Sequence, residues 1–176
     1  MREKLGIKSS IIIVLKDTVT GFKRVIRTKN LITDAGDLYY AQRGIDALPT
    51  NFTNGSAVFD AIMELYNGAS AAPDKANDRS DLVGLVTGSG KAMDSTYPKL
   101  NDDDTDNEDA GVDIITYRVT YAKAEANAAG IADVILTNPS PGASEPLLMH
   151  AEFAAPFEKT ASMVLKVFLN HQMNGV

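Results

Sequence analysis

The stretch "DIITYRVTYAK", Asp113–Lys123, alternates apolar and polar side chains along its length. The apolar side consists of Ile115, Tyr117, Val119 and Tyr121. Successive side chains of a β-strand point to opposite faces, so this period of two predicts a strand with one buried face. We therefore expect Tyr117 and Tyr121 to belong to a core rather than to a binding surface.

Other segments carry similar β-strand signals. The run Ser10–Leu15 is rich in β-branched residues, and a Thr-Gly turn separates it from a second β-prone run, which predicts an N-terminal hairpin. Turn-rich sequences, among them "PFEKTAS", delimit three alternating segments: Gly130–Asn138, Leu147–Ala154 and Met163–Gln172. This spacing, without a βαβ pattern, predicts a mainly β protein. We expect one antiparallel β-sandwich domain, jelly-roll-like, over residues 1–176.

Two segments between these strands need separate interpretation. "TKNLITDAGDLYYAQRG", Thr28–Gly44, indicates a corner at which a strand ends and a short helix begins. Thr33 or Asp34 fits the N-cap, and Gly44 stands where a left-handed residue ends a helix. Val58–Gly68 fits both helical and strand periods, but its short length and Asn-Gly end favour a strand.

The composition is that of an ordinary globular protein. The chain has 176 residues, 44% hydrophobic and 23% charged, with no apolar run of about 18 residues that would cross a membrane. The apolar run Ile11–Leu15 is too short for a signal-peptide core, so we expect a protein that is not secreted. The absence of cysteine excludes disulfides, thiolate metal sites and cysteine nucleophiles, and two histidines offer little for acid–base chemistry.

Charge is distributed unevenly along the chain. Residues 1–30 form a basic hairpin or arm with eight Lys and Arg against two acidic residues, although the net charge of the chain is −6. Such asymmetry indicates either an oriented docking face or a charged edge that resists aggregation. We expect Lys23, Arg24 and Arg27 to contact an acidic surface, on the same or a neighbouring chain. An acidic chain without interleaved basic and aromatic residues disfavours nucleic-acid binding.

A long loop region, residues 69–111, is poor in large apolar side chains, and loops of this length are usually functional or mobile. Within this region, the segment "GLVTGSGKA", Gly84–Ala92, resembles a phosphate-binding loop. Its glycine spacing is one residue off, and Lys91 is followed by Ala92 instead of a hydroxyl residue. We therefore interpret this segment as an ordinary loop.

An acidic segment, "NDDDTDNEDAGVD", is the stronger candidate for ligand binding. Asp102, Asp104 and Asp106 alternate as calcium-loop ligands do, and Asp113 falls at the twelfth position. The sixth position is Asn107 where such loops need glycine. The alternatives are a bound cation, a solvated loop and a contact with a protein partner; we favour the last two.

The remaining acid–base candidates are sparse. His150 and His171 lack any nearby triad or metal-ligand spacing, and we expect both at the surface or an interface. Glu152 and Glu158 could pair as acid and base, but any acidic chain offers such pairs. We therefore predict no enzyme: no catalytic, cofactor-binding or metal-binding residue is assigned, and no cofactor is expected.

The order of these segments resembles that of a group of tailed-bacteriophage virion structural proteins. The resemblance begins with a charged hairpin followed by "KNLITDAG" and continues through "ITYRVTYAKAEANAAGIADVIL" to "LLMHAEFAAPFEKTASMVLKVFLNH". The resemblance lies in the order and local composition of the segments and includes no diagnostic motif. The acidic residues 101–109 are not part of the pattern.

The resemblance implies a β-sandwich that assembles in many copies on a phage particle, made in the host cytoplasm and located in the virion. Its partners would be other copies of itself and the major capsid or other phage structural proteins, without nucleic acid or membrane. A capsid decoration or stabilising protein is the first expectation. The alternatives are a neck, tail or fibre-attachment component and, more remotely, a carbohydrate-binding module.

Overall fold

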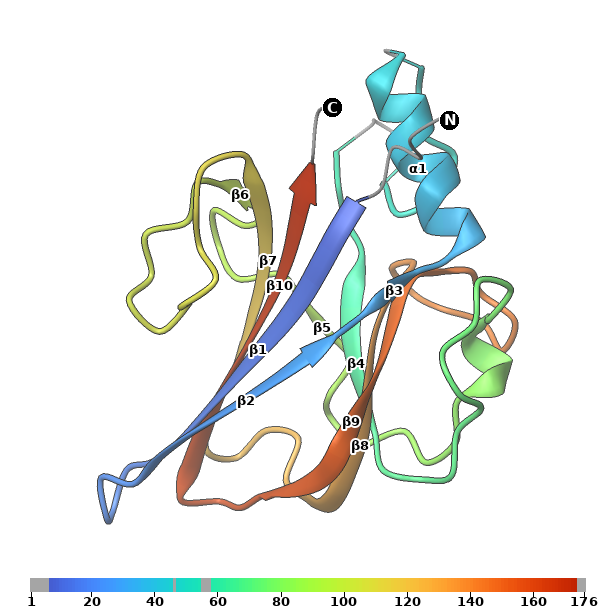
Figure 1. Cartoon of the computed structure of the whole chain (residues 1–176). Helices are drawn as coiled ribbons and strands as arrows, with labels where there is room; N and C mark the ends of the chain where they lie inside the picture. Colours follow the sequence, from blue (N-terminus) through green and yellow to red (C-terminus); the bar gives the residue numbers. More distant parts are fainter. Residues whose placement is uncertain (1–6, 46, 55–57, 174–176) are drawn as a thin grey trace.

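The computed structural model describes residues 7–45, 47–54 and 58–173. Two antiparallel sheets of five strands pack face to face as a β-sandwich (Figure 1). The hairpin sheet has the order β2 (Lys23–Lys29), β1 (Ile7–Asp17), β10 (Met163–Met173), β7 (Ile114–Tyr121), β6 (Lys99–Leu100). The helix sheet has the order β3 (Leu31–Ile32), β9 (Leu147–Lys159), β8 (Ala128–Thr137), β4 (Ile62–Tyr66), β5 (Lys91–Ala92).

The core forms from the inner faces of both sheets, as the period of two predicts. Tyr117, Val119 and Tyr121 are at most 2% exposed and pack in one cluster with residues of β1, β4, β8, β9 and β10. Within the segment with two competing periods, Ile62–Tyr66 forms strand β4, and its alternating Met63 and Leu65 are fully buried in the same cluster. The predicted fold class is therefore confirmed.

The corner predicted before the helix is present. Helix α1 (Asp34–Gly44) begins after Thr33, whose Oγ1 accepts a hydrogen bond from Gly36 N at 3.2 Å and donates to the Leu147 carbonyl. A Cβ at Gly36 would lie 2.1 Å from the Leu148 carbonyl oxygen, so glycine alone permits this close approach. The placement of Gly44 at a left-handed position is wrong, because it is the last helical residue and Ile45 forms the C-cap.

Strand β9 is longer than predicted. It continues through "PFEK" to Lys159, where the sequence indicated a turn. Ile131 pairs with Phe157 but Asp133 pairs with Glu152, so β9 carries extra residues that leave the regular ladder between these pairs. Proline lacks an N–H and is compatible with such a bulge, which is why Pro156 does not end the strand.

The long region 69–111 is mostly loop, as predicted, with the one-turn helix η1 (Arg79–Asp81), β5 and β6 as its short regular elements. Two segments, one within this region and one that extends two residues past it, cover the outer faces of the sandwich. We call residues 69–83, over the helix sheet, the Arg79 strap, and residues 101–113, over the hairpin sheet, the acidic strap. Among the described residues, no helix has the length and apolar character that a membrane crossing requires.

Candidate functional site

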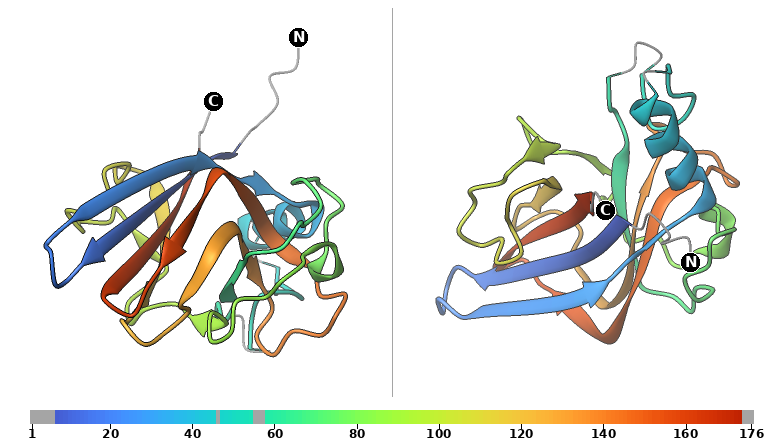
Figure 2. Two further views of the ribbon diagram at one scale, coloured as in Figure 1. Left: turned by 90° about the horizontal axis from the view of Figure 1, so that it is seen from below. Right: turned by 45° about the horizontal axis from the view of Figure 1, so that its top comes forward.

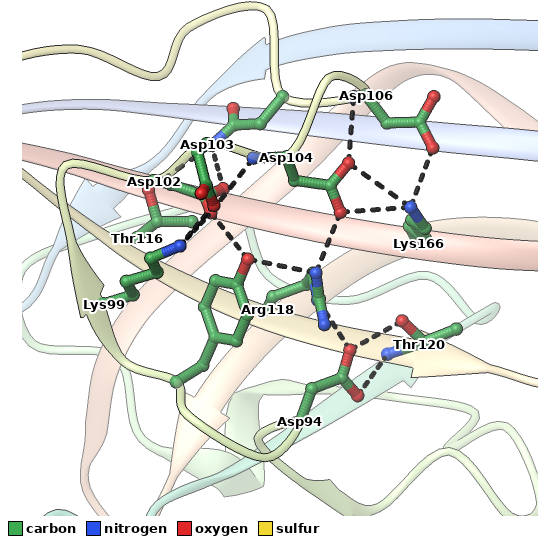
Figure 3. Close-up of polar contacts among 12 residues, drawn as sticks. Asp94, Lys99, Asp102, Asp103, Asp104, Asp106, Thr116, Arg118, Thr120 and Lys166 are labelled. Atoms are coloured by element: carbon green, nitrogen blue, oxygen red, sulfur yellow. Dashed lines mark hydrogen bonds and ion pairs between the residues drawn. The ribbon is translucent and has the colours of Figure 1, made fainter.

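The acidic strap crosses the outer face of the hairpin sheet and is fastened by cations of the sheet (Figure 3). Asp104 accepts from Arg118 Nη1 of β7 at 2.8 Å and from Lys166 Nζ of β10 at 3.0 Å. Arg118 also binds Asp94 through Nε at 2.7 Å, so one guanidinium joins two segments of the loop region. The strand period places both cations on the face opposite the core.

Further along, the strap reaches the N-terminal hairpin. Asp106 accepts from Lys166 Nζ and from Lys23 Nζ, each at 2.8 Å, and Arg27 pairs with Glu108. These lysines lower the pKa of Asp106 to about 2, with Lys166 the largest cause. The predicted contact between the basic hairpin and an acidic surface is therefore present for Lys23 and Arg27, within the same chain.

A buried amide cluster lies beneath these ion pairs. Asn107 and Asn170 exchange two hydrogen bonds of 2.8 and 3.0 Å, and Thr116 Oγ1 donates to Asn170 at 2.7 Å. Beside it, a small apolar cluster of Ile12, Val14 and Phe168 is at most 3% exposed although it lies on the outer face. The two amides position the strap, and covering the apolar side chains removes them from water, which stabilises the fold.

Three of the four carboxylates that resembled calcium ligands, those of Asp102, Asp104 and Asp106, are thus engaged by protein groups. Asp102 accepts from Tyr97 Oη at 2.6 Å and Asn107 Nδ2 at 3.0 Å; burial opposes its ionisation, but these bonds outweigh that effect and lower its pKa. Asp113 is exposed, with φ of 61°. Within the described parts of the chain, no three acidic or histidine side chains are grouped so that they could hold a metal ion.

The Arg79 strap is fastened to the helix sheet by one deeply placed ion pair. Arg79 binds Glu64 of β4 through Nε at 2.8 Å and Nη2 at 3.2 Å, and Tyr66 Oη donates to the same carboxylate at 2.7 Å. The Glu64 side chain is 3% exposed, and its hydrogen bond raises the pKa of Arg79. Leu82 adds an apolar contact by packing with Tyr66, Ile135 and Leu147.

His150 is buried beneath this strap, so the expectation of a surface residue is wrong. Its Nε2 lies 3.1 Å from Asp133 Oδ1 of β8, and its Nδ1 lies 3.0 Å from Asn77 Oδ1. The Asn77 amide is held by Asp74 N, which donates to Oδ1, and by Asp81, which accepts from Nδ2. Both imidazole nitrogens therefore face oxygen acceptors, and a nitrogen that carries hydrogen donates to the oxygen it faces.

His171 is also buried, contrary to expectation, at the end of the core that α1 closes. Its Nδ1 bonds to Tyr40 Oη, which lies 2.8 Å from Tyr117 Oη, and its Nε2 lies 3.2 Å from Asn30 Nδ2. Burial lowers the pKa of His171 to about 3, so the ring is neutral near pH 7. The side chain joins β10 to α1 and β7 in a structural network.

The other sequence candidates have separate positions. Lys91, from the segment that resembled a phosphate loop, donates to the Thr120 carbonyl at 2.8 Å and to Glu125 at 2.7 Å. Glu152 and Glu158 are both exposed on β9. The structure therefore assembles none of these residues with His150 or His171 into a joint site.

Several residues of these networks escaped the sequence interpretation. Arg118 and Lys166 are single cations on the polar side of otherwise apolar strands, and this position could have marked them as partners for an acidic loop. Glu64 similarly stands between Met63 and Leu65. No comparable signal identifies Arg79, because its loop is rich in small and polar residues.

No protein-family model, curated protein or solved structure matches this chain.

Proposed function

We propose that this chain is a structural subunit of a tailed-bacteriophage particle, specifically a capsid decoration or stabilising protein that binds in many copies. The order of its sequence segments supports this assignment, as does the β-sandwich that the resemblance implies. Catalysis is no part of the proposal.

The observation that carries the proposal is the use of polar side chains to hold loops on both outer faces. Asp104, Asp106 and Glu64 each bind cations of another segment of the chain. Ion pairs of this kind hold each loop in a fixed position on the sheet that it covers, which makes the surface rigid. A subunit that contributes mechanical stability to a shell requires such a surface more than a reactive pocket.

Quantitative mass spectrometry of purified particles tests the assignment directly. Particles from the source that encodes this chain should contain it at hundreds of copies, in a fixed ratio to the major capsid protein. A dozen copies or fewer would indicate a neck or tail component and overturn the decoration role. Absence from particles, with expression verified in the producing cells, would contradict a virion role altogether.

A further inference from the structure

The free edge of β2 differs from the other sheet edges. Among the described residues, the edge strands are β2, β6, β3 and β5, and β2 has seven residues whereas each of the others has two. Its register with β1 is continuous from Lys23 to Lys29. A long, regular edge presents a row of backbone donors and acceptors that can pair with another strand. The hairpin projects beyond its neighbours, as Figure 2 shows.

The alternation of hydrogen-bonded and non-hydrogen-bonded residue pairs between β1 and β2 identifies which backbone groups of β2 are available to pair with another strand. Asp17 N donates to the Phe22 carbonyl at 2.8 Å, which closes the hairpin. Hydrogen-bonded and non-bonded pairs alternate in an antiparallel ladder, so the N–H and carbonyl groups of Lys23, Val25 and Arg27 point away from β1. At the far end, Thr28 Oγ1 donates to the Glu152 carbonyl at 3.1 Å and ties β2 to β9. The open edge therefore runs from Lys23 to Arg27.

The positive charge of β2 indicates which kind of strand would pair with it. β2 carries four cations, of which Arg24 and Lys29 form no ion pair with another described residue. Pairing of β2 with a second β2 would bring like charges together, which disfavours a symmetric contact between two copies. An acidic strand would instead find opposite charges along the edge.

A small pocket beside the turn end of the hairpin adds an apolar contact. Its volume is about 210 Å³, and it is lined by Leu15, Asp17, Phe22, Arg24, Glu158 and Met163. Phe22 is 60% exposed. A strand added beside β2 would direct alternate side chains toward this side of the sheet, where the pocket can accept an apolar one.

We propose that the edge Lys23–Arg27 binds an extended acidic segment of another protein, which adds a sixth strand to the hairpin sheet. The inference deepens the proposed function by giving the chemistry of the partner segment. Its test uses the isolated chain, so that failure of this contact and absence of the chain from particles are separate results.

The probe is a synthetic peptide of about nine residues that alternates Glu with Val and Thr. Titrated to about 1 mM, it should shift the amide NMR signals of β2 and slow hydrogen exchange at Lys23, Val25 and Arg27. The same peptide with Lys in place of Glu should bind at least about 10-fold more weakly. Absence of protection at β2, or equal binding of the two peptides, would overturn the proposal.

Two variants separate backbone pairing from charge. Val25→Pro removes one outward N–H, and we expect at least about a 10-fold loss of affinity, whereas the matched Val25→Thr variant should bind normally. Arg24→Glu with Lys29→Glu should reverse the preference toward the Lys peptide. If the proline variant does not fold, this charge reversal alone decides, because an unchanged preference contradicts the assigned partner chemistry.

Discussion

The two straps cover equivalent faces of the sandwich but are held in different ways. The acidic strap uses several ion pairs with partly exposed side chains, such as Lys166 at 29% and Lys23 at 42%. The Arg79 strap relies on Glu64, whose side chain is 3% exposed, and on the apolar contact of Leu82. Distributed, solvated pairs are individually weak, whereas a buried charge depends strongly on the one cation that pairs with it. The straps should therefore respond differently to mutation, acid and salt.

The largest effect should come from Arg79→Met. The substitution leaves the Glu64 carboxylate buried without its cation, and we expect a loss of about 3 kcal/mol in the free energy of unfolding. Urea denaturation measures this loss. Adding Glu64→Gln to Arg79→Met should restore much of the stability, and equal stability of the single variant and wild type would contradict the role of this pair.

Acidification should weaken the acidic strap next. The pKa of Asp106 is lowered to about 2 in the folded protein, so its contribution is present above the unfolded value of 3.8 and is lost as pH falls toward 2. We expect the free energy of local opening of the strap to fall by about 1 to 2 kcal/mol. This is less than the full effect of the pKa change on stability, because the side chain is partly exposed. Hydrogen exchange of strap amides between pH 4 and 2 reports it after correction for the intrinsic rate, and Asp106→Asn should reduce this dependence, with the remainder due to the other strap carboxylates whose pKa is lowered.

Asp104→Asn should cost about 1 kcal/mol in the free energy of unfolding, because it weakens the charged bonds to Arg118 and Lys166. Asp103→Asn is the matched control, since the Asp103 side chain is 86% exposed and pairs only with Lys99 among the described residues. Thermal melts compare the two variants. Equal effects would show that net acidity, rather than the specific contacts, holds the strap.

The smallest effect should follow charge reversal on the hairpin. Lys23→Glu and Arg27→Glu each remove one exposed pair with the strap, and we expect about 0.5 kcal/mol apiece, diminishing as salt is added. Lys16→Glu on the adjacent strand serves as the control, because Lys16 forms no ion pair with another described residue. Chemical denaturation at low and high salt measures the difference, and a larger effect at high salt would exclude an ion-pair origin.

The sequence predicted the strands and the corner because their signals are local. The alternation around Tyr117 and the Thr33 cap depend on neighbouring residues. The networks around the two histidines depend instead on distant partners: His150 meets Asn77 across 73 positions, and His171 meets Tyr40 across 131. Without that pairing, a polar residue in a strand is more readily interpreted as exposed. The acidic loop and basic hairpin could be matched because both carry a strong excess of charge.

Native-state hydrogen exchange at low salt and at about 1 M NaCl tests the central difference most directly. At the higher concentration the Debye length falls to about 3 Å, so interactions between exposed charges are largely screened. The acidic strap should exchange faster in salt at Asp106 and Asn107, whose amides bond to Asp104. The Arg79 strap should keep its protection at Ala71 and Arg79, whose amides bond to Asp81 and Glu145. Equal acceleration of both straps, or no response in the acidic one, would contradict the account.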